Sequence, residues 1–217
     1  RNEVPSSSAS SAVEAEVDGL NPSAVVVTTS LAYALVTGVS VAAAAKFGLP
    51  ASSPPPLQLP QALLYTTPLL ISLAYFVSRR ESDNGVKEIY RLLRESLGPV
   101  LLAASTPWWG SLAMATGAGV GEEALFRGVL QPWIATYLDG DISLVLTSTV
   151  FGALHAVTPL YFFWATSAGL LFGIESELAG WTSSALTHVL YDYIAFCIMT
   201  KIWEGEASVS ESRMDDM

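Results

Sequence analysis

The sequence has little charge for its length. Only 14% of its 217 residues are charged and 51% are hydrophobic, whereas soluble domains average about 25% charged residues. The charges are concentrated in the two tails and in short loops, and the apolar stretches between them are long enough to cross a bilayer. The composition therefore predicts an integral membrane protein whose main partner is the lipid bilayer.

Basic residues and cysteines are also scarce. Lysine and arginine together number 10, against 20 acidic residues. The chain has no basic stripe, so nucleic acid is not an expected partner. The lone cysteine, Cys197, cannot form an intrachain disulfide, and we interpret it as a small apolar residue within a hydrophobic run.

The apolar runs predict a helical bundle. A spanning helix needs about 20 mostly apolar residues, and the chain has room for about six or seven. Because lipid cannot satisfy unpaired backbone groups, the expected fold is an all-α polytopic transmembrane bundle. Residues 98–137 are apolar for about two crossings, and their small-residue run at 115–121 predicts either a break or close helix packing. The other spans are expected at 24–47, 61–78, 142–157, 160–174 and 181–203.

The chain divides into four predicted segments. Residues 1–23 are rich in Ser and Ala, and because no Met begins the chain we interpret them as the disordered tail of a processed protein. Residues 24–97 hold two spans and, near their end, an amphipathic helix on the membrane surface, with an ordinary solvated loop helix as the alternative. The basic residues around that helix predict a cytosolic or stromal location for it. Residues 98–203 are the predicted core, and residues 204–217 are an acidic tail that we expect to be disordered.

Ionisable residues are almost absent from the predicted spans, where each one costs about 2.5 to 3.5 kcal/mol. The exceptions form three clusters, and these include both histidines of the chain. So few polar groups, kept in a hydrophobic setting, indicate a functional site. The clusters are Glu122 and Glu123 with Arg127, then His155, then His188 with Asp192.

Helix geometry separates the two adjacent glutamates. Glu123 and Arg127 are four residues apart, so they share a helix face and can form a salt bridge. Glu122 points about 100° away and is free for other chemistry. An alternative is that both glutamates pair with the one arginine. His188 and Asp192 are again four residues apart, and such a pair can also be purely structural.

These residue types are suited to hydrolysis of an amide bond. A buried carboxylate can take a proton from water that a neighbouring histidine holds, and a second histidine with a short polar side chain can donate to an oxyanion. Alternatively, Glu122, His155 and His188 could hold a zinc ion that carries the attacking water. The sequence leaves open whether the cofactor is zinc or none.

The three clusters resemble a known family. EEALFR, FGALH and HVLYD are similar to the EExxxR, FxxxH and HxxxN/D motifs of the Abi/CAAX-type (CPBP) intramembrane proteases, in the same order, over about residues 98–203. The resemblance implies helices around a polar cavity and cleavage of a membrane-associated protein or peptide, in some members after a prenylated cysteine. The implied roles are water activation by Glu122 with His155, oxyanion stabilisation by His188 with Asp192, and a structural ion pair of Glu123 with Arg127.

Asp192 departs from the pattern, because the branch that acts on prenylated proteins typically has Asn there. An ionised Asp cannot donate a hydrogen bond, so Asp192 must be protonated or must orient His188. This weakens the case for farnesylated substrates more than the case for hydrolysis. The Ser- and Ala-rich acidic tail also resembles plant or algal plastid members, which predicts a chloroplast membrane.

Other functions have less support from the sequence. Other intramembrane proteases need HExxH, GxSG or two mid-span aspartates, and the chain has none of these. The main alternative is a non-catalytic membrane scaffold or immunity-type binding protein that uses the same fold. A proton-coupled carrier is a third hypothesis, and the absence of an internal repeat speaks against it.

Overall fold

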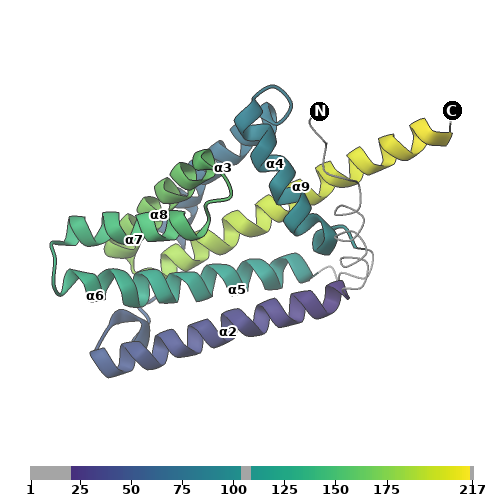
Figure 1. Cartoon of the computed structure of the whole chain (residues 1–217). Coiled ribbons are helices and arrows are strands. Elements are labelled where there is room, and N and C mark those ends of the chain that lie inside the picture. Colours follow the sequence, from purple (N-terminus) through teal and green to yellow (C-terminus); the bar gives the residue numbers. More distant parts are fainter. Residues whose placement is uncertain (1–20, 104–108, 216–217) are drawn as a thin grey trace, which may run out of the picture.

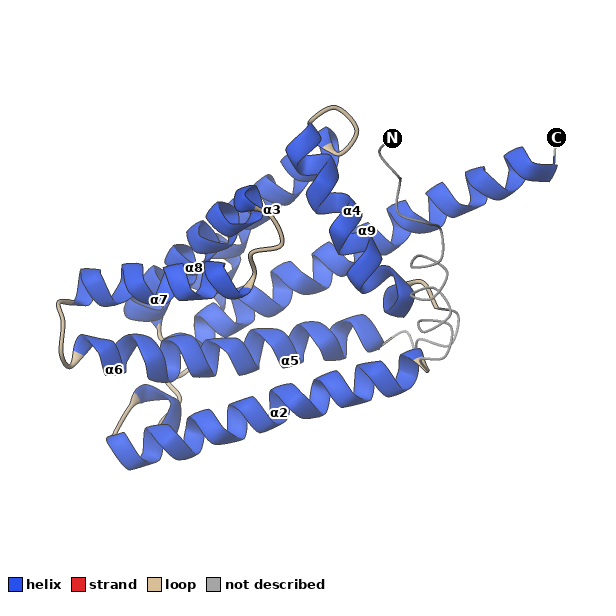
Figure 2. Ribbon diagram, in the orientation of Figure 1, coloured by secondary structure: helices blue, strands red, loops and turns tan. Residues whose placement is uncertain are grey.

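The computed structural model describes residues 21–103 and 109–215, with residues 207–215 as backbone only. Every regular element in these ranges is a helix (Figure 1, Figure 2), which confirms the predicted all-α fold. The predicted N-terminal tail lies outside the described residues except for residues 21–23. The elements are α2 (Pro22–Phe47), η1 (Pro50–Ser52), α3 (Leu59–Arg79), α4 (Asn84–Leu101), α5 (Gly110–Leu125), η2 (Phe126–Leu130), α6 (Gln131–Ala135), α7 (Gly140–Leu154), α8 (Pro159–Ala179) and α9 (Trp181–Asp215).

Local sequence signals define the ends of α2. The Asn21 side chain accepts hydrogen bonds from the first free backbone N–H groups, and Pro22 occupies the first turn, where no partner for its nitrogen is needed. At the other end, Gly48 adopts a φ of 66°, a left-handed conformation that favours glycine. The proline-rich link that follows then packs against the start of α9, where the Trp181 indole donates to the Pro50 carbonyl.

Helix α5 lies between α2 and α9. It packs on one side against α2, which runs beside it in the same direction, and on the other side against α9 (Figure 1). Helices α7 and α8 pack against each other, and α8 also contacts α9. This arrangement brings the three predicted polar clusters, from α5, α7 and α9, to one region.

The small-residue run of α5 is a close-packing site, and the helix continues through it without a break. Gly119 faces α9, where an added Cβ would lie 2.6 Å from the Val189 side chain and 2.8 Å from its backbone nitrogen. Gly117 and Gly121 face α2 instead, against Tyr33. Alternating small residues therefore let α5 approach a helix on each side.

Of the helices in the described residues, two are long and apolar enough to cross a membrane, α2 and α3. Only 11% of the most apolar stretch of α2 and 22% of that of α3 is buried inside the protein. A soluble core helix would instead bury most of its apolar surface. The total of six or seven spans remains a prediction. Large apolar side chains point outward along one face of α2, at Val27, Leu31, Leu35 and Val39.

The C-terminal region differs from the expectation. Helix α9 continues to Asp215 and extends away from the bundle (Figure 1), whereas we expected a disordered tail from residue 204. Contacts with α4 hold the first turn of this extension, because Glu206 accepts hydrogen bonds from Tyr90 and Arg94. The same contacts fix the predicted amphipathic helix α4, which buries Val86 and Ile89 toward the bundle.

Candidate active site

Three helices deliver the predicted residues to one cavity. Glu122 comes from the last turn of α5, His155 follows the end of α7, and His188 and Asp192 lie on successive turns of α9. All four side chains line a cavity of about 430 Å³. The structure therefore brings together the four residues that the sequence analysis selected for chemistry.

Glu122, His155 and Tyr33 form the part of the site that we call the open cluster. Oε2 of Glu122 lies 3.5 Å from Nε2 of His155, and these side chains are 14% and 32% exposed. The other carboxylate oxygen, Oε1, accepts a hydrogen bond from the Tyr33 hydroxyl at 3.0 Å. Oε2 has no hydrogen-bond partner among the described residues. One carboxylate oxygen is thus fixed, and the other faces His155 across a short gap.

The tautomer of His155 follows from its surroundings. Nδ1 lies 2.8 Å from the Phe151 carbonyl oxygen, which can only accept a hydrogen bond, so Nδ1 carries a hydrogen. In the neutral ring Nε2 is then an acceptor that faces the Glu122 carboxylate. The ring also stacks on Phe151, with centroids 4.4 Å apart. Two acceptors at this distance do not bond to each other, but one water molecule can donate to both.

Glu123, Arg127, Ser184 and His188 form a second group, which we call the buried cluster. Glu123 and Arg127 are joined at 2.9 Å and both side chains are 0% exposed. Arg127 also donates to the Gly169 carbonyl at 2.8 Å, and Ser184 donates to the other Glu123 oxygen at 2.9 Å. Arg127 lies in η2, a single π-helical turn that directly follows α5. Among the described residues, Arg127 forms its ion pair with Glu123, the partner that the helix spacing predicts.

His188 connects the buried cluster to the cavity. Its Nδ1 lies 3.3 Å from Oε1 of Glu123, and its Nε2 lies 3.5 Å from Oδ2 of Asp192. The ring stacks on Phe172 with centroids 4.7 Å apart. Because Glu123 is already paired with Arg127, it acts as an acceptor and Nδ1 of His188 donates to it. Nε2 and Asp192 then stand together at the cavity wall.

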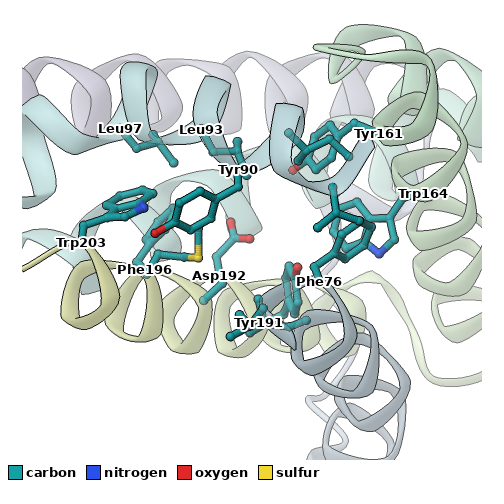
Figure 3. A pocket seen from close by; sticks show the side chains of 16 residues that line it. Phe76, Tyr90, Leu93, Leu97, Tyr161, Trp164, Tyr191, Asp192, Phe196 and Trp203 are labelled. Atoms are coloured by element: carbon teal, nitrogen blue, oxygen red, sulfur yellow. The ribbon is translucent and has the colours of Figure 1, made fainter. Parts of the chain in front are cut away.

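A second, smaller cavity of about 110 Å³ adjoins the first between α3, α4, α8 and α9. Figure 3 shows Asp192 rising from α9 into it among aromatic side chains, which include Tyr161, Trp164 and Phe196. These residues also line the first cavity. The Trp164 indole donates to the Ser72 hydroxyl at 3.1 Å, which ties the cavity wall to α3. The polar site therefore opens onto an apolar and aromatic space.

The residues do not fit a zinc site. Among the described residues, no three His, Cys, Asp or Glu side chains are grouped so that they could hold a metal ion. The ring nitrogens of His188, one of the three ligands considered from the sequence, lie instead 3.3 Å from Glu123 and 3.5 Å from Asp192. We therefore derive no chemical step through a metal.

Sequence reasoning missed several polar side chains of the site. Tyr33 and Ser184 contact the two glutamates from other helices. Tyrosine and serine are common in apolar segments, so their residue type alone does not mark them as part of a site. Glu175, near the end of α8, is 0% exposed and accepts a hydrogen bond from Thr187 at 2.9 Å. A carboxyl group in a long apolar run was the only available signal for it.

The fold and the site together define a helical membrane protein with a buried polar centre. Residues 104–194, less than half of the 217-residue chain, match the family model described as Rce1-like, type II CAAX prenyl endopeptidase. This match confirms the resemblance of the segment to the Abi/CAAX-type family. The family is membrane-integral and is a family of proteases. A prenylated substrate and a plastid location remain predictions.

No curated protein and no solved structure matched the chain.

Proposed function

We propose that this protein is an intramembrane endopeptidase that hydrolyses a peptide bond of a membrane-associated protein. The observation that carries the proposal is the pairing of Glu122 with His155 at 3.5 Å on the wall of a cavity of about 430 Å³. Two hydrogen-bond acceptors that face each other are suited to hold and orient one water molecule. The membership of residues 104–194 in a protease family supports the same reaction.

In the proposed mechanism, Glu122 is the general base. It takes a proton from the water that it holds with His155, and the oxygen of that water attacks the carbonyl carbon of the substrate. Negative charge then develops on the carbonyl oxygen. The donor to this oxygen is either the Nε2–H of a protonated His188 or the carboxyl O–H of a protonated Asp192. Glu122 finally transfers its proton to the leaving amine as the peptide bond breaks.

Asp192 has a defined part in this scheme, although the branch that acts on prenylated proteins typically has Asn there. It lies 3.5 Å from Nε2 of His188 on the same helix face. Whether the proton resides on the ring or on the carboxyl group, one of the two can donate toward the cavity. The contact of Nδ1 with Glu123 fixes the ring orientation.

The test compares the membrane-protein N-termini of cells that carry wild-type protein, Glu122→Gln or Glu95→Gln. Glu95 is the matched control, because it is an exposed glutamate of α4 that contacts only Arg91 among the ion pairs described. We expect a set of N-termini that is present with wild type and with Glu95→Gln and absent with Glu122→Gln. Identical N-termini in all three, with the variants accumulating normally, would contradict hydrolysis and favour a non-catalytic scaffold.

A further inference from the structure

We propose that Tyr33 on α2 is a positioning residue for Glu122, so that the active centre includes a helix outside the family-matched segment 104–194. The inference rests on the proposed function, because it gives Tyr33 a part in the same hydrolysis. Tyr33 lines the cavity together with His155 and Asp192. Helix α2 otherwise presents mainly apolar side chains to the outside.

The hydrogen bond of Tyr33 selects one orientation of the Glu122 carboxylate. The hydroxyl donates to Oε1 at 3.0 Å, and an ionised carboxylate can only accept. The terminal torsion of a glutamate side chain is broad, so the carboxylate would rotate freely without such a bond. With Oε1 held by Tyr33, Oε2 faces His155 at 3.5 Å. Tyr33 therefore determines that Oε2, and not Oε1, of Glu122 accepts the hydrogen bond from the water.

A recess on α5 holds the Tyr33 ring in place. Gly117 and Gly121 are four residues apart on one helix face, and Gly121 directly precedes Glu122. An added Cβ at Gly121 would lie 3.0 Å from Cδ1 of Tyr33 and 3.2 Å from its backbone oxygen, and one at Gly117 would lie 3.3 Å from the Tyr33 Cβ. All three distances are shorter than ordinary van der Waals contact. The two glycines thus let α2 come close enough for the hydroxyl to reach Glu122.

The first test uses Tyr33→Phe, which keeps the ring and removes only the hydroxyl. The substrate is a peptide that spans a cleavage site lost in Glu122→Gln. We expect kcat to fall about 10- to 100-fold, the size expected for losing one hydrogen bond to a charged group. KM should stay within about twofold, because the bond acts on the general base and not on the substrate. The control is Tyr75→Phe on α3, where the ring is 52% exposed.

The outcomes separate the two proposals. Wild-type kcat in Tyr33→Phe, while Glu122→Gln is inactive, would overturn the role of Tyr33 and leave the proposed function intact. A change in KM alone would also overturn it, because Tyr33 would then bind substrate. If Glu122→Gln cleaves normally, both proposals fail. The Tyr33→Phe result supports a positioning role only if each variant unfolds in detergent at the wild-type temperature. A lowered unfolding temperature, with a proportional loss of active protein, would contradict the positioning role.

A second test moves the tyrosine without changing it. Gly121→Ala pushes Tyr33 away from α5, whereas Gly38→Ala on α2 adds a methyl group where nothing lies within 4 Å. We expect Gly121→Ala to lower kcat to the level of Tyr33→Phe and Gly38→Ala to cleave like wild type. Equal rates for both alanine variants would overturn the proposed role of the recess.

Discussion

Glu122 and Glu123 are adjacent in the chain, but their surroundings differ. Glu123 is fully buried and is held by Arg127 and Ser184, with His188 at 3.3 Å. Glu122 lines a cavity, accepts one hydrogen bond from Tyr33, and leaves its second oxygen without a partner among the described residues. A carboxylate whose partners are all protein groups contributes to structure, and one with a free lone pair beside a histidine can do chemistry.

The difference arises from helix geometry. A rotation of about 100° per residue directs neighbouring side chains to different helices. Glu123 turns toward α9 and the π-helical turn η2, and Glu122 turns toward α2 and the end of α7. The buried cluster and the open cluster are therefore supported by different contacts, and substitutions can disturb one cluster while leaving the other.

The largest effect is expected from Arg127→Ala. This change leaves the Glu123 carboxylate without its cation at a site that is 0% exposed. Removing one partner of a buried ion pair costs about 3–5 kcal/mol, so we expect the protein to accumulate poorly and to unfold at a lower temperature in detergent. The control is Arg91→Ala, whose side chain is 52% exposed and pairs with Glu88 and Glu95 on the helix surface. A wild-type unfolding temperature for Arg127→Ala would contradict a structural role for the buried cluster.

A smaller effect is expected from Gly119→Ala, which disturbs the contact between α5 and α9. The new methyl group would lie 2.8 Å from the backbone nitrogen of Val189, so the helices must separate. Overpacking of this kind costs about 1–3 kcal/mol, and here it also draws His188 away from Glu123. Thermal unfolding should detect the loss. If Gly119→Ala instead keeps its stability and loses only kcat, the two clusters are not separable in the way that we describe.

The smallest effect is expected from Glu175→Gln. Glu175 is 0% exposed, but it forms no ion pair among the described side chains and accepts its hydrogen bond from Thr187. Glutamine is neutral and keeps an acceptor for Thr187, so the free energy of unfolding should change by less than about 1 kcal/mol. Chemical or thermal unfolding in detergent measures this. A loss as large as that of Arg127→Ala would show that Glu175 carries a charge that the bundle needs.

Much of this architecture could be predicted from the sequence, because it depends on local patterns. The span expected at 61–78 corresponds to Leu59–Arg79, and the span expected at 142–157 corresponds to Gly140–Leu154. The pair Glu123–Arg127 and the pair His188–Asp192 follow from spacing along one helix, and the structure brings each pair within contact distance.

Contacts between helices could not be predicted in the same way. The bond from Tyr33 to Glu122 joins residues 89 positions apart, and the register of α2 against α5 decides it. In the sequence alone, the glycines that set this register are as consistent with a break in the helix as with close packing. The helical extension of α9 was missed because its acidic composition is typical of a tail, and its anchor on α4 is again a long-range contact.

The most direct test of the account compares Glu122→Gln and Glu123→Gln in one experiment. Both proteins are purified in the same detergent, their thermal unfolding is recorded, and each is assayed on a peptide from a cleavage site found in cells. We predict that Glu122→Gln unfolds at the wild-type temperature and does not cleave, and that Glu123→Gln unfolds at a clearly lower temperature because it leaves Arg127 buried without its partner. Wild-type stability for Glu123→Gln, or wild-type cleavage by Glu122→Gln, would contradict the division of the two adjacent glutamates into a structural and a chemical role.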